Sequence, residues 1–91
     1  MKHNSYFGGK VQSLGFNAPE GYATAGVIES GRYAFNTDTE EHMHIMAGTL
    51  RAKLPGAEWQ SFGRGQFFVV PAKVKFDVEA AADVAYVCYY K

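Results

Sequence analysis

Short stretches in which large apolar residues alternate with small or polar ones recur along the chain. Tyr33 and Phe35, for example, alternate with Arg32, Ala34 and Asn36. This period of two is that of a β-strand with one buried face. No window combines helical apolar spacing with freedom from glycine and proline, and ten glycines are spread between the apolar stretches. The pattern therefore predicts an all-β fold, a sandwich or barrel with many short turns.

The strands can be placed from this alternation and from the turn residues that interrupt it. We expect them at Lys10–Phe16, Tyr22–Glu29, Arg32–Thr37, Glu41–Ala47, Thr49–Leu54, Trp59–Phe62, Gln66–Val70, Val74–Val78 and Val84–Tyr90. So many short strands joined by short loops predict an antiparallel barrel or jelly roll. We expect a single domain over residues 1–91, with residues 1–5 flexible.

Composition and charge narrow the functional classes. Hydrophobic residues make up 47% of the 91 residues and aromatic residues 15%, which supports a core without disulfides. Lys+Arg and Asp+Glu both number nine, and no basic run points to nucleic acid. The single cysteine, Cys88, and the absence of a signal-peptide or membrane pattern predict a soluble cytoplasmic protein. A domain this small and aromatic-rich is also expected to dimerise.

Two spaced motifs give the first resemblance to a known family. Glu41 is followed after six residues by Gly48, and Gly65 is followed after five by Pro71. This order and spacing resemble the two motifs of the cupin superfamily, which implies an RmlC-like jelly-roll barrel.

A more specific resemblance covers nearly the whole chain. The segments "YFGGKVQSLGF" (6–16), "AGVIESGRYAF" (25–35), "EEHMHIMAGTL" (40–50), "LPGAEWQ" (54–60), "GQFFVVPAKVKFDV" (65–78) and "YVCYY" (86–90) are similar to the small single-cupin pyrimidine/purine nucleoside phosphorylases. The resemblance implies a pentosyltransferase of broad specificity. It would convert a purine or pyrimidine nucleoside and orthophosphate into the free base and (deoxy)ribose 1-phosphate, and it would act as a homodimer.

The metal ligands of other cupins are missing from their expected positions. The two histidine slots ahead of Glu41 hold Phe35 and Thr37, or Ala34 and Asn36 with the other permitted spacing, and the slot after Pro71 holds Phe76. A lone carboxylate does not make a metal site. We therefore expect no metal and no cofactor, with phosphate as a co-substrate.

The two histidines near Glu41 do not restore a metal site. His42 and His44 have opposite parity along the strand, so they should face outward, with Met46, while Met43 and Ile45 face inward with Glu41. We expect these histidines to lie at the surface or at a subunit interface.

Candidate site residues follow from the same parity. Glu41 should face the interior, where a carboxylate without a metal needs other hydrogen-bond partners, and we assign it the catalytic role. Facing residues with aromatic rings or polar tips would bind the nucleoside, since stacking tolerates any base: Tyr33, Phe35, Thr37, Phe76 and Tyr86.

Phosphate is assigned to Lys10 and Ser13. Lys10 follows two glycines whose N–H groups could also face an anion, and Ser13 lies on the same strand. Cys88 is interpreted as an inert core thiol.

Two other functions fit part of the pattern. A non-catalytic cupin that binds a small ligand would also have an aromatic pocket with one carboxylate. A metal-dependent isomerase or dioxygenase would require the missing histidines. Nucleoside cleavage measured with and without phosphate and EDTA separates these alternatives.

Overall fold

The structure, a computed structural model, describes all 91 residues as ten strands and one 3-10 helix. The elements in chain order are β1 (Lys2–Tyr6), η1 (Phe7–Gly9), β2 (Val11–Ala18), β3 (Gly21–Ile28), β4 (Gly31–Asn36), β5 (Glu41–Ala47), β6 (Leu50–Lys53), β7 (Gln60–Phe62), β8 (Phe67–Val70), β9 (Lys75–Ala80) and β10 (Val84–Tyr90). Every predicted strand is present, and the β5 and β10 ends are as predicted. No helix is both long and apolar enough to span a membrane.

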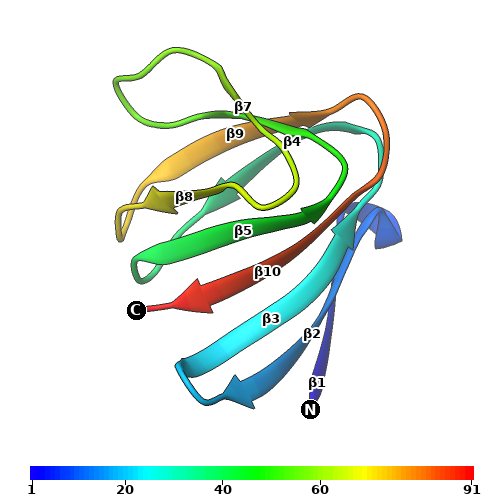
Figure 1. Cartoon of the computed structure of the whole chain (residues 1–91), viewed down its shortest axis with the longest axis vertical. Helices are drawn as coiled ribbons and strands as arrows, with labels where there is room; N and C mark the ends of the chain where they lie inside the picture. The colour runs from blue at the N-terminus through cyan, green and yellow to red at the C-terminus, as the bar shows by residue number, and fades with distance from the viewer.

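The strands form two antiparallel sheets that pack against each other (Figure 1). One sheet has the order β1-β2-β3-β10-β5-β8, and the other has the order β4-β9-β6-β7. The last strand, β10, lies between β3 and β5, so the end of the chain completes the centre of the larger sheet. This two-sheet arrangement confirms the predicted all-β fold of antiparallel strands.

The core lies between the sheets and follows the alternation in the sequence. On β5, Met43 and Ile45 are buried, whereas Met46 is 53% exposed. Leu50 and Val78 meet them from the smaller sheet, with no exposed surface at all. The inward and outward assignments made for β5 are therefore confirmed.

The expectation that residues 1–5 are flexible is wrong for residues 2–5. They belong to β1, which pairs with β2 in a register that places His3 opposite Leu14. The side chain of His3 contacts Gln12, and Asn4 donates to Ser13. The strand escaped prediction because it is an edge strand that is mostly exposed on both faces, so it needs no apolar alternation.

The glycine of the first motif has a specific packing role. Gly48 follows β5 with φ at +83°, and a Cβ there would lie 2.7 Å from the carbonyl oxygen of Asp83. Only glycine fits this turn without moving the neighbouring main chain.

Candidate functional site

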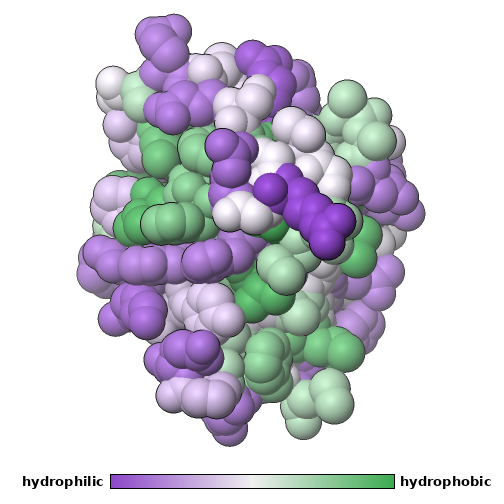
Figure 2. All heavy atoms as spheres, viewed as in Figure 1, coloured by the Kyte–Doolittle hydropathy of each residue, from purple (hydrophilic) through white to green (hydrophobic).

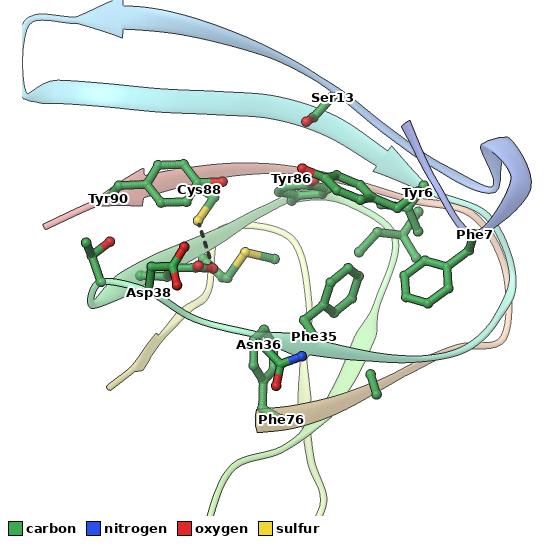
Figure 3. A pocket seen from close by; sticks show the side chains of 16 residues that line it. Tyr6, Phe7, Ser13, Phe35, Asn36, Asp38, Phe76, Tyr86, Cys88 and Tyr90 are labelled. Atoms are coloured by element: carbon green, nitrogen blue, oxygen red, sulfur yellow. Dashed lines mark hydrogen bonds between the residues drawn. The ribbon is translucent and has the colours of Figure 1, made fainter. Parts of the chain in front are cut away.

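A cavity of about 440 Å³ lies between the two sheets and opens to solvent at their edge. Its walls come from β2, β3, β4, β5, β9 and β10, together with Tyr6, Phe7 and the loop that joins β4 to β5. Figure 3 shows that its two ends differ in chemistry. The carboxyl group of Asp38 lies at one end with Cys88 and Tyr90, and the rings of Phe7, Phe35 and Tyr86 gather toward the other.

The polar end is built around Glu41. Its side chain accepts a hydrogen bond from the Cys88 thiol, with Sγ and Oε1 3.6 Å apart. Burial raises the pKa of Glu41, the bond from Cys88 lowers it, and the nearby carboxylate of Asp38 raises it. Tyr90 closes this end, and its hydroxyl is 3.0 Å from Oγ1 of Thr24. Glu41 is thus a partly buried carboxyl with a single weak hydrogen bond from the protein.

The Cys88 thiol and the hydroxyls of Tyr86 and Tyr90 keep their protons at neutral pH. Burial and the nearby Glu41 raise the pKa of the Cys88 thiol well above its ordinary value. Burial likewise raises the pKa of Tyr90, and it raises that of Tyr86 to about 12, an increase that Ser13 moderates. The thiol is therefore a poor nucleophile, as expected for a core cysteine, and both tyrosine hydroxyls remain available as donors.

The aromatic end is formed mainly by Phe7, Phe35 and Phe76. The ring centroids of Phe35 and Phe76 are 5.7 Å apart, and Phe7 meets Phe35 edge-on at 5.5 Å. Phe7 has φ at +54°, an uncommon conformation for a residue with a side chain. It is 45% exposed, so the end of this wall reaches the surface.

Five of the predicted site residues line the cavity. Glu41, Phe35, Phe76, Tyr86 and Ser13 all contribute to its walls, from five different strands and both sheets. Strand parity indicated this position for Glu41, Phe35, Phe76 and Tyr86, whereas Ser13 was chosen for its place on the strand of Lys10.

Three other predicted residues, Tyr33, Thr37 and Lys10, do not line the cavity. Tyr33 is buried, but its hydroxyl donates to the main-chain oxygen of Glu29. Thr37 is also buried, and its hydroxyl donates to the oxygen of Pro71 at 2.6 Å. Strand parity predicted that both side chains are buried. It did not predict that their hydroxyl groups already donate hydrogen bonds to main-chain carbonyl oxygens.

Lys10 also lies away from the cavity. It borders a separate depression with Gln12, Leu14 and Val27, which point to the outer face of the larger sheet. Since no lysine or arginine lines the main cavity, this placement gives no support to the assignment of Lys10 to phosphate.

Sequence reasoning missed the parts of the site that come from loops and strand edges. Tyr6 and Phe7 come from the N-terminal segment, Asp38 and Thr39 come from the β4–β5 loop, and Asn36 precedes that loop. The resemblance of "YFGGK" was the only signal for the first pair, and nothing in the periodicity marked the others.

The histidines near Glu41 lie outside the cavity. Nε2 of His42 is 2.7 Å from a carboxylate oxygen of Glu40. His44 stacks on Phe67 with ring centroids 5.0 Å apart. No group of three or more His, Cys, Asp or Glu side chains is placed to hold a metal ion.

Comparison with known proteins identifies the family. The family model described as pyrimidine/purine nucleoside phosphorylase matches residues 1–90. The chain belongs to this family. A protein of that name from Pseudomonas paraeruginosa is 47% identical over 92 aligned positions, which cover 100% of this chain and 99% of the relative. The one from Pseudomonas entomophila is 46% identical, with 100% and 98% covered.

Solved structures agree with this fold. A Vibrio parahaemolyticus protein described as of unknown function superposes with a TM-score of 0.94 at 37% identity, covering 99% of this chain and 97% of that one. A cupin-2 domain protein from Shewanella frigidimarina superposes with a TM-score of 0.61 at 18% identity, covering 76% and 71% of the two chains. The second similarity supports the cupin fold alone.

Proposed function

We propose that this chain catalyses phosphorolysis of purine and pyrimidine nucleosides without a metal or cofactor. The N-glycosidic bond breaks, a phosphate oxygen bonds to the anomeric carbon, and the base leaves with the proton that hydrogen phosphate gives up. The products are a free base and (deoxy)ribose 1-phosphate. The observation that carries the proposal is the two-ended cavity, with a carboxyl end and an aromatic end, in a member of this family.

The aromatic end suits the base. A volume of about 440 Å³ falls within the range of about 300–1,000 Å³ typical of small-molecule sites. Stacking on Phe35 or Phe7 would tolerate purine and pyrimidine alike, because every base has a π-face.

The carboxyl end suits the sugar. With the base against the aromatic rings, the ribose would lie toward Asp38 and Glu41, which can accept hydrogen bonds from its hydroxyl groups. Positive charge develops on the sugar as the base departs, and an ionised Glu41 would stabilise that charge. Because burial raises the pKa of Glu41, the ionised form and the activity should increase as pH rises through that value.

Phosphate requires donors, and the cavity offers neutral ones. We assign it to the hydroxyl of Ser13, as expected from the sequence, with the hydroxyl of Tyr86 in place of Lys10. The pKa of about 12 keeps Tyr86 protonated and able to donate. Ser13→Ala should raise the KM for phosphate more than the KM for nucleoside, whereas Lys10→Ala should change neither.

The outer face of the larger sheet supports the proposed homodimer. Leu14, Val27, Met46 and Phe67 are between 44% and 55% exposed on it. Figure 2 shows apolar residues gathered over these strands, with hydrophilic ones between them. The outward residues of β5, β8 and β10 include no lysine, arginine, aspartate or glutamate. Because these three strands present none of these charged residues outward, we propose that a second copy of the chain covers this part of the face.

The direct experiment is to incubate the purified protein with uridine and inosine and to measure free base by chromatography. Base should form only when phosphate is present, and EDTA should not prevent it. Binding of nucleosides without any release of base would instead support a non-catalytic cupin.

A further inference from the structure

Strand β4 borders the cavity with a free edge. It is the outermost strand of the smaller sheet and pairs only with β9. Ala34, Phe35 and Asn36 all line the cavity, although neighbouring residues of a strand point to opposite faces. Phe35 projects into the cavity toward Tyr86 in Figure 3. Ala34 and Asn36 have the opposite parity, so the free edge of β4 brings their main chain to the border of the cavity.

The hydrogen-bond pattern shows which main-chain groups are free. The N–H of Thr37 donates to the oxygen of Val74 at 2.9 Å, which makes this a hydrogen-bonded pair of the β4–β9 ladder. Such pairs alternate with non-bonded pairs in an antiparallel ladder. Phe35 is thus bonded to β9, while Ala34 and Asn36 direct their N–H and C=O groups to the free edge.

No hydrogen bond outside the strand ladders uses these groups. The main-chain contacts of turns and loops do not include Ala34 or Asn36, and no side chain bonds to their main chain. Each residue thus offers the cavity one unused donor and one unused acceptor, side by side.

A nucleobase has the complementary arrangement. Uracil presents N3–H beside a carbonyl oxygen, cytosine an amino group beside N3, adenine an amino group beside N1, and guanine N1–H beside O6. The N–H and C=O groups of one extended residue can pair with this adjacent acceptor and donor, as they would with a neighbouring strand. The main-chain couple cannot distinguish one base from another, because all four present a donor next to an acceptor.

We propose that the free edge of β4, at Ala34 and Asn36, binds the pairing edge of the nucleobase. This inference rests on the proposed function and extends it. It places the face of the base against the Phe35 ring and the pairing edge of the base at the free edge of β4. Because the main chain recognises this edge, both purines and pyrimidines would be accepted. Asn36 and Ala34 take part through their main chain, so their side chains would not set the specificity.

The test with the unaltered protein uses a blocked base. A methyl group on N3 of uridine removes the donor and crowds the edge while leaving ribose and stacking unchanged. We expect kcat/KM for 3-methyluridine to be at least about ten-fold lower than for uridine, the effect of one lost hydrogen bond with its partner left unsatisfied. Equal cleavage of the two nucleosides would overturn the inference while leaving the phosphorylase function intact.

Proline variants test the strand itself. Proline removes one N–H and is tolerated at the free side of an edge strand. Because one base edge pairs with one residue, at least one of Ala34→Pro and Asn36→Pro should lower kcat/KM about ten-fold for uridine and inosine alike. The matched control is Arg32→Pro, because Arg32 occupies the same kind of non-bonded position but does not line the cavity. It should stay within about two-fold of the wild type. If all three variants behave alike, the edge does not bind the base.

The inference can still be tested if a proline variant fails to fold or if the protein does not cleave nucleosides. The comparison of uridine with 3-methyluridine needs no variant. Were the wild-type protein to release no base, the proposed function would fail, and calorimetric binding of the same two nucleosides would still decide the inference. Tight binding of uridine with at least about ten-fold weaker binding of the methylated form would support it, and equal or absent binding would overturn it.

Discussion

Replacing Glu41 by glutamine removes the charge of this side chain while keeping its size. Burial raises the pKa of Glu41 above its ordinary value of 4.5. Between these two values the folded protein keeps a proton that the unfolded chain has lost, so the free energy of unfolding falls as pH rises. The limiting slope for one such group is about 1.4 kcal/mol per pH unit. Because Glu41 is only partly buried, solvent screening makes this slope an upper limit.

The Glu41→Gln variant should not show this loss. Its unfolding free energy should be close to that of the wild type at about pH 4. The difference should then grow in favour of the variant and become constant above the raised pKa. Only the 3.6 Å contact with Cys88 is altered in the fold, so no large loss of stability opposes this trend. Urea unfolding of both proteins across a pH series measures the difference directly.

Activity should change in the opposite direction. If the ionised carboxylate stabilises charge on the sugar, Glu41→Gln should lower kcat by about 100-fold or more in a protein that is equally or more stable. Asp38→Asn is the matched control, since it removes the neighbouring carboxylate and should cost less. Full activity in Glu41→Gln would refute the catalytic assignment, and a stability difference that does not vary with pH would refute the raised pKa.

The other predictions concern stability and assembly. Phe76→Ala empties part of the core, where Phe76 is only 3% exposed, and should lower the unfolding free energy by about 3–5 kcal/mol in urea unfolding; a smaller loss would mean that the cavity collapses. Thr37→Val removes the hydroxyl that bonds two main-chain groups, so it should cost about 1–3 kcal/mol and leave the KM for nucleosides unchanged. A raised KM would show instead that Thr37 reaches the substrate. Val27→Lys and Phe67→Lys place charge on the outer face and should convert a dimer into a monomer by light scattering, whereas an unchanged mass would exclude that face as the interface.

Strand periodicity predicted the fold well because most strands have one buried face. β5 and β10 could be placed to the residue, and the inward orientation of Glu41, Phe35 and Phe76 followed from it. β1 could not be placed because an edge strand exposed on both sides has no apolar alternation to reveal it.

The site was only partly predictable for related reasons. Parity says whether Tyr33 and Thr37 are buried, but it does not say that nearby main-chain groups already bind their hydroxyls. Phe7 and Asp38 lie outside regular strands, so their approach to the cavity depends on turns that periodicity does not describe. The free main-chain groups of β4 are independent of residue type, and only the sheet order reveals them.

The central claim is that this chain cleaves nucleosides with phosphate and without a metal. Its most direct test is chromatographic measurement of free base from uridine and from inosine, with and without phosphate, before and after treatment with EDTA. The proposed function predicts uracil and hypoxanthine, together with ribose 1-phosphate, only when phosphate is present and unchanged by EDTA. The claim would be contradicted if uridine or inosine released no base in the presence of phosphate. It would also be contradicted if EDTA abolished the release.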